Sequence, residues 1–176
     1  MLYWPRIERI LRRAMIRSLV VDASFVMRSV LPGPLREPVK TLLAGWQDRG
    51  DTIQVPALWY YEITSALSRG VTFKEFSRDQ AEAMLALITE FDFAVIVPDA
   101  AQVQRAFDWT LRLRRAAAYD SFYLALAETT RDGLWTADER LYNATKSLVP
   151  WVHWADDPDT EETNRAAILR QSQRRQ

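Results

Sequence analysis

Four short apolar runs constrain the fold of this chain more than any other feature of its sequence. They occupy residues 19–22, 52–55, 93–97 and 134–136, and residues 151–154 form a fifth candidate. Continuous apolar runs of this kind are typical of strands in a parallel sheet that is buried on both faces. Parallel neighbours need a long crossover connection, and segments of helical length separate the runs. The sequence therefore predicts an α/β domain built on a parallel sheet.

The segments between the runs carry the signals of helix starts and stops. Ser77 opens one of them, Asp99 is placed as the N-cap of another, and Gly70 is placed as a stop. The predicted helices cover residues 35–48, 57–69, 77–91, 100–114, 119–130, 138–145 and 166–175.

The chain of 176 residues has the size of one domain. We expect this domain at residues 18–157, between a basic N-terminal extension at 1–17 and a polar C-terminal tail at 158–176. The extension carries five arginines against one glutamate and lacks the apolar core of a signal peptide. It is interpreted either as a stretch translated upstream of a start at Met15, or as an amphipathic helix that docks on a partner or a membrane surface.

Composition excludes several classes of function. The chain has no cysteine, which excludes disulfides, thiolate zinc sites and a cysteine nucleophile, and which fits a cytoplasmic location. Its 23 basic and 23 acidic side chains balance, so a uniformly basic nucleic-acid surface is not expected. The only histidine, His153, has aromatic neighbours that indicate packing rather than catalysis. No apolar stretch is long enough to cross a membrane.

Four acidic residues fall where the carboxyl ends of the predicted strands meet. Asp22 ends the first run, Asp138 follows the fourth run, and Glu62 and Asp120 lie early in predicted helices. Ligands of open α/β sheets bind at this edge. Each acid alone is better explained as a helix cap or a solvated residue, but their joint placement predicts carboxylates that converge. A hard cation such as Mg²⁺ or Mn²⁺ would relieve their repulsion and could serve phosphodiester hydrolysis.

These acids lie in four ordered motifs that resemble those of the PIN domain, in particular the VapC-like toxins of bacterial toxin–antitoxin pairs. The motifs read VVDAS from Val20, VPALWYYEITSAL from Val55, AYDSFYLALA from Ala118 and LWTADERL from Leu134. The resemblance covers about residues 18–154. Ser65 is a departure, since many relatives carry asparagine at that place in the second motif.

The resemblance implies a three-layer sandwich with a central parallel sheet in the order 3-2-1-4-5, flanked by helices. It also implies a metal-dependent endoribonuclease that acts as the toxin of a toxin–antitoxin pair. The catalytic residues would be Asp22, Glu62, Asp120 and Asp138. Of these, Asp22, Asp120 and Asp138 would hold Mg²⁺ or Mn²⁺, and Ser24 and Thr136 would support the site.

The expected partners are an RNA substrate, a second copy of the chain and an antitoxin whose basic residue reaches Asp22 and Asp120. Candidate RNA contacts, each of which taken alone is better explained as a solvated helix residue, are Arg112, Arg114, Arg115 and Arg140. Candidate interface aromatics, which a core could also absorb, are Trp46, Trp59, Tyr60, Tyr61 and Trp109.

Two alternatives without catalysis stay open. The first is a magnesium-binding regulatory module of the receiver kind, which would place a lysine near the acids. The three lysines, Lys40, Lys74 and Lys146, all lie away from the predicted strand ends. The second is a PIN fold that only binds a partner, and the presence of all four acids argues against it.

Overall fold

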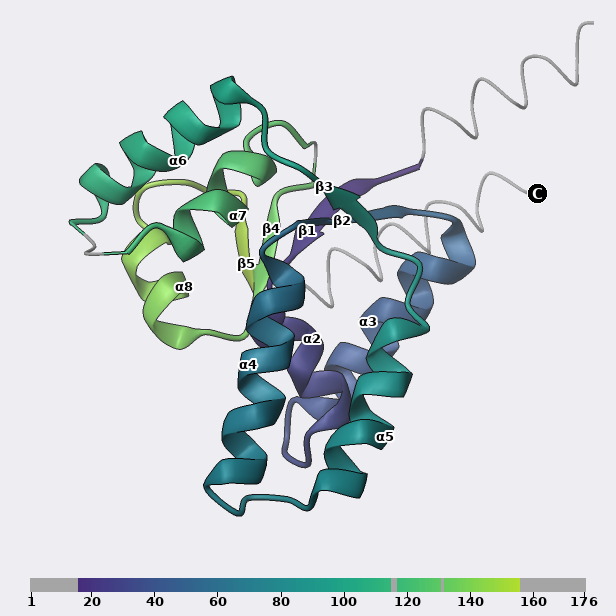
Figure 1. Ribbon diagram of the computed structural model, residues 1–176. Coiled ribbons are helices and arrows are strands. Elements are labelled where there is room, and N and C mark those ends of the chain that lie inside the picture. The colour runs from purple at the N-terminus through teal and green to yellow at the C-terminus, as the bar shows by residue number, and fades with distance from the viewer. Residues whose placement is uncertain (1–15, 115–116, 131, 156–176) are drawn as a thin grey trace, which may run out of the picture.

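The computed structural model describes residues 16–114, 117–130 and 132–155, and a five-stranded sheet lies at its centre (Figure 1). Each strand pairs in parallel with its neighbours, in the order β3-β2-β1-β4-β5. The strands are Ser18–Val21 (β1), Thr52–Pro56 (β2), Ala94–Ile96 (β3), Leu134–Thr136 (β4) and Val152–Trp154 (β5). The predicted α/β class and the strand order are both confirmed.

Helices flank this sheet on both sides (Figure 1). Helices α6 and α7 pack closely together, α2 packs on α3, and α4 and α5 run side by side away from the sheet. Within the described ranges the helices are Ala23–Val30 (α2), Arg36–Arg49 (α3), Trp59–Thr72 (α4), Arg78–Thr89 (α5), Ala100–Arg112 (α6), Tyr119–Ala127 (α7) and Glu139–Thr145 (α8).

Helix α2 is the one element of the described chain that the sequence analysis did not assign. Its N-cap is Asp22, whose carboxylate accepts a hydrogen bond from the backbone N–H of Phe25 at 2.7 Å. The residue that ends β1 therefore also begins a helix. Helix α2 has only eight residues and follows the apolar run of β1 after a single residue, so the sequence gives no separation between strand and helix.

The predicted helix stop at Gly70 is wrong, because α4 continues to Thr72. Gly70 is buried inside the helix, and a Cβ atom built on it would lie 2.0 Å from the ring of Phe76. The glycine thus serves the close approach of an aromatic ring to the helix backbone.

An aromatic cluster fills the core between α2, α3 and β4. The ring of Trp46 lies 5.6 Å from that of Phe25 and 5.0 Å from that of Trp135, measured between centroids. His153 packs on Trp135, and the centroids of these two rings lie 5.0 Å apart. The interpretation of the single histidine as a packed residue is therefore confirmed.

The aromatic residues considered for an interface divide into two groups. Trp46, Trp59 and Trp109 are buried in the core, so an interface role for these three is wrong. Tyr60 and Tyr61 are 52% and 76% exposed.

Several predictions fall on residues outside the described ranges. These are the helix at 166–175, the tail at 158–176, Arg115, and the N-terminal extension apart from residues 16 and 17. Among the helices of the described ranges, none has the length and apolar character needed to cross a membrane.

Gly133 offers a test of how tightly β4 is joined to β5. Its φ is +68°, and an added Cβ would lie 1.9 Å from the carbonyl oxygen of Trp151. We expect Gly133→Ala to lower the free energy of unfolding by about 3 kcal/mol, because it combines a positive φ with overpacking against backbone. Gly50, with φ +72° and open space around it, is the matched control and should lose about 1 kcal/mol as alanine. Equal losses in urea denaturation would contradict the packing argument.

Candidate active site

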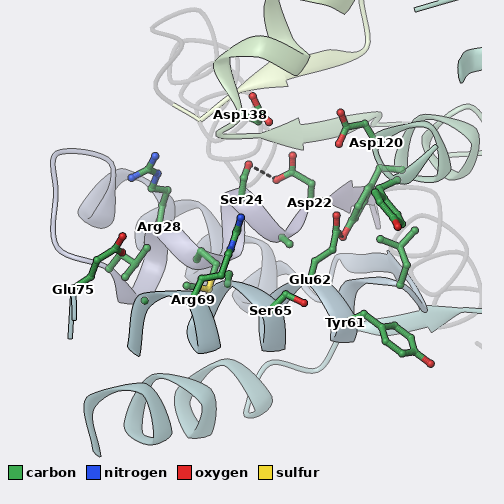
Figure 2. Close-up of a pocket in the computed structure, with 18 of the residues that line it drawn as sticks. Asp22, Ser24, Arg28, Tyr61, Glu62, Ser65, Arg69, Glu75, Asp120 and Asp138 are labelled. Atoms are coloured by element: carbon green, nitrogen blue, oxygen red, sulfur yellow. Dashed lines mark hydrogen bonds between the residues drawn. The ribbon is translucent and has the colours of Figure 1, made fainter. Parts of the chain in front are cut away.

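A pocket of about 1000 Å³ opens beside the carboxyl ends of the strands. Its walls come from α2, α4 and the starts of α7 and α8. All four predicted acids line it, and Figure 2 shows their carboxyl groups around one space. The structure thus brings together Asp22, Glu62, Asp120 and Asp138.

Asp22 is the most buried of the four acids, with 5% of its surface exposed. Its Oδ1 accepts hydrogen bonds from the Ser24 hydroxyl and the Phe25 N–H, each at 2.7 Å, and its Oδ2 accepts one from the Thr136 hydroxyl at 2.5 Å. Burial raises the pKa of Asp22 to about 6. The three hydrogen bonds act in the opposite direction, and the charge of Asp138 adds to the increase.

Ser24 and Thr136 link Asp22 to the segment that carries Asp138. The Ser24 hydroxyl oxygen accepts a hydrogen bond from the Ala137 N–H at 3.0 Å, and the Thr136 hydroxyl oxygen accepts one from the Asp138 N–H at 2.9 Å. The same two hydroxyl groups donate to Asp22. These contacts hold the end of β4 and the start of α2 in a fixed relation around the carboxylate.

Asp138 is both a helix cap and a pocket residue. Its Oδ1 accepts hydrogen bonds from the N–H groups of Arg140 at 2.8 Å and Leu141 at 3.3 Å. These bonds make Asp138 the N-cap of α8. Its side chain also faces the pocket (Figure 2). The two explanations that the sequence left open for this residue therefore apply together.

Glu62 lies in the first turn of α4, where the buried phenol of Tyr123 donates a hydrogen bond to its Oε2. The pKa of Glu62 is raised to about 7, mainly by burial and in smaller part by the charges of Asp22 and Asp120. The hydrogen bond from Tyr123 acts against this increase. The pKa of Tyr123 is itself raised, by burial and by the neighbouring negative charges.

Tyr123 is a pocket residue that the sequence motifs did not single out. A signal was present, because Tyr123 follows Asp120 by three residues on α7 and side chains at that spacing share a helix face. Ser65 also lines the pocket, as its place in the second motif implies.

The arginines that line the pocket are not the predicted ones. Arg28 and Arg69 line it, on α2 and α4. Arg112 instead lies over the ring of Trp109, with its guanidinium carbon 4.7 Å from the ring centroid. Arg114 is exposed just after the end of α6 and does not line the pocket. Arg140 is exposed, with its Nε 3.8 Å from Asp138. Helix spacing was the missed signal, since Arg28 follows Ser24 by four residues and Arg69 follows Glu62 by seven.

The four acids have the chemistry of hard-cation ligands, although their carboxyl groups do not gather around a single point. Within the described residues, no three His, Cys, Asp or Glu side chains stand close enough together to hold an ion. The carboxylates of Asp22 and Asp138 are turned toward the hydrogen-bond donors that they accept from. Oxygen ligands of this type are those that Mg²⁺ and Mn²⁺ prefer. Burial is the main cause of the raised pKa values of Asp22 and Glu62, and repulsion between the carboxylates, which a cation would relieve, adds to it.

A comparison with protein families identifies this arrangement. The model of the PIN domain matches residues 19–147, which include all four acids. The chain belongs to the PIN domain family. PIN domains are generally metal-dependent nucleases. No curated protein matches the sequence.

The raised pKa values of this PIN domain predict a pH dependence of its stability in EDTA. Asp22 and Glu62 bind protons in the folded state at pH values where the unfolded chain, with ordinary pKa values of 3.8 and 4.5, has released them. Their contribution to stability is therefore fully present below about pH 4 and lost as pH rises through about 7. We expect the loss to be on the order of 3 kcal/mol for the coupled pair.

The measurement is urea denaturation across this pH range, compared with the double variant Asp22→Asn/Glu62→Gln. Subtracting the double variant removes the effect of the other carboxylates. Wild-type stability should fall with pH relative to the double variant, and parallel pH profiles would show that neither pKa is raised.

Proposed function

We propose that this PIN domain is a metal-dependent endoribonuclease and the toxin of a toxin–antitoxin pair. The observation that carries the proposal is the meeting of four acids, from four separate segments of the chain, in one pocket of a PIN fold. The proposed boundaries of the domain are residues 18–157.

Asp22, Asp120 and Asp138 would hold Mg²⁺ or Mn²⁺. Such an ion, when bound, lowers the pKa of water and neutralises charge on a phosphodiester. Ser24 and Thr136 fix the orientation of Asp22 through the hydrogen bonds that they donate. The burial of Asp22 keeps bulk water from competing for these contacts.

Glu62 is the proposed proton carrier of the site. Its pKa of about 7 allows its carboxyl group to hold or release a proton near neutral pH, as general acid–base catalysis requires. The O–H of Tyr123 occupies Oε2, which leaves Oε1 as the atom that exchanges a proton with the substrate.

The proposed partners are a second copy of the chain and an antitoxin in the cytoplasm. An arginine or lysine of the antitoxin would pair with Asp22 and Asp120 in place of the cation. Of the aromatic residues considered for interfaces, Tyr60 and Tyr61 remain available at the surface.

Cleavage of single-stranded RNA by the purified chain, with Mg²⁺, Mn²⁺ or EDTA, tests the activity. We expect Asp22→Asn to reduce the cleavage rate by at least about a hundredfold, because it removes a charged metal ligand while keeping its shape. Asp48→Asn, on the exposed surface of α3, is the matched control and should leave the rate unchanged. An unaltered rate in a folded Asp22→Asn protein would contradict the site. Absence of cleavage with every metal would favour the partner-binding alternative.

Thermal unfolding tests the cation site without reference to activity. We expect saturating Mg²⁺ or Mn²⁺ to raise Tm by about 5 °C or more, since an ion that binds only the folded state stabilises it by mass action. Asp138→Asn should melt at or above the wild-type temperature in EDTA, because a like charge is gone and asparagine caps a helix equally well. The same variant should respond less to metal. A wild-type Tm that metal leaves unmoved would contradict a cation site.

A further inference from the structure

The pocket continues past the acids as a groove between α2 and α4. One face of each helix lines it, with side chains spaced three or four residues apart. From α2 these are Ala23, Ser24, Met27 and Arg28, and from α4 they are Tyr61, Glu62, Ser65, Ala66, Arg69 and Gly70. The groove thus has an acidic end, at the sheet, and a basic end, at the last turns of both helices.

Arg28 and Arg69 lie on this groove with no partner for their charge. In the described part of the chain neither takes part in an ion pair or a side-chain hydrogen bond, whereas Arg17, Arg49, Arg78 and Arg140 each lie within 4.0 Å of an acid. Figure 2 shows the Arg69 side chain rising from α4 toward α2, with its nitrogen end between Arg28 and Glu62 in this view. Two guanidinium groups without a charged partner, one on each wall of the groove, are suited to binding an anion.

We propose that Arg28 and Arg69 bind the phosphates of the RNA strand on one side of the bond that is cleaved. This inference rests on the proposed function, and it specifies how the substrate lies. The seven residues from Glu62 to Arg69 span about 10 Å of helix, and the four from Ser24 to Arg28 about 6 Å. The arginines therefore meet phosphates next to the reacting one, not the reacting phosphate itself.

Other groove residues indicate where the strand continues and where it stops. Glu75 lines the groove near Arg28 and would repel a further phosphate, so this arm accommodates a short segment (Figure 2). Tyr61 lies on the opposite side of Glu62 from Arg69, and its ring is largely exposed (Figure 2). An unpaired base can stack on such a ring, whereas the bases of a duplex are already stacked. The groove therefore favours a single strand.

The test is binding of a short fluorescein-labelled single-stranded oligouridylate, measured by anisotropy in EDTA over a series of salt concentrations. EDTA prevents metal-dependent cleavage, so the readout is independent of activity. We expect Arg28→Gln and Arg69→Gln each to weaken binding by roughly three- to tenfold. Each should also reduce the slope of log K against log salt by about 0.7, which is the signature of one lost phosphate contact on a single strand. Arg36→Gln, on the exposed start of α3 and outside the groove, should change neither quantity.

A neighbouring pair of tyrosines provides a second, independent readout. Tyr61→Ala should weaken binding by roughly fivefold or more while leaving the salt slope unchanged, since stacking releases no counterions. Tyr60→Ala is the matched control, because Tyr60 is also exposed but packs on Trp59 and does not line the groove.

The outcomes separate this proposal from the proposed function. If the Arg28→Gln/Arg69→Gln double variant binds the oligouridylate as well as the wild type does, the phosphate-binding role is overturned. The same holds if neither the wild type nor the double variant binds it. The groove would then be a candidate surface for a protein partner. That result leaves the hundredfold loss expected of Asp22→Asn untouched. Conversely, arginine-dependent binding by a protein that cleaves nothing with any metal would retain the groove and reject the nuclease.

Discussion

The burial of the Asp22 carboxylate is the constraint on which the rest of the site depends. A charged group removed from water is costly unless hydrogen-bond donors surround it. Here the donors come from the first turn of α2 and from the end of β4. The Asp22 side chain, which faces the pocket, therefore depends both on the pairing of β1 with β4 and on the start of α2. Fold and site cannot be separated at this point, because the contacts that satisfy the carboxylate are also those that place Asp138 beside it.

The site is held in an electrostatically unfavourable state, and the chain provides partial compensation. Burial and like charge raise the pKa values of both Asp22 and Glu62. The phenol of Tyr123 and the hydroxyls of Ser24 and Thr136 oppose this increase without removing it. A proton or a cation can complete the compensation, and the two are mutually exclusive on a given carboxylate oxygen. Local conflict of this kind is expected where a site is shaped for a ligand rather than for stability.

The elements and the acidic edge could be predicted from the sequence because they follow from short-range rules. Apolar runs define the strands, and parallel pairing then brings their carboxyl ends to one edge. Helix α2 escaped prediction because the residue that ends the strand is also its cap and because the helix has only eight residues. Gly70 was mistaken for a helix stop because the ring that requires a glycine there, that of Phe76, lies beyond the end of the helix. Tyr123, Arg28 and Arg69 depend on which helix faces meet, and that is decided by tertiary packing around α2.

The basic and acidic residues of the chain balance in number, but within one groove they are separated into an acidic end and a basic end. The balanced composition argues against a uniformly basic surface, yet RNA binding does not require one. A phosphodiester that approaches four carboxylates is repelled until their charge is reduced, so binding energy must come from elsewhere along the strand. Unpaired arginines at the far end of the same groove can supply it without neutralising the acids, because they lie at the last turns of α2 and α4 rather than at the sheet edge. Arginines placed directly among the acids would instead form ion pairs with them and compete with a cation for the same oxygens. Separation of the two charges along α4, with Glu62 in its first turn and Arg69 in its last, would therefore allow one groove to hold both the proposed cation and the proposed anionic strand.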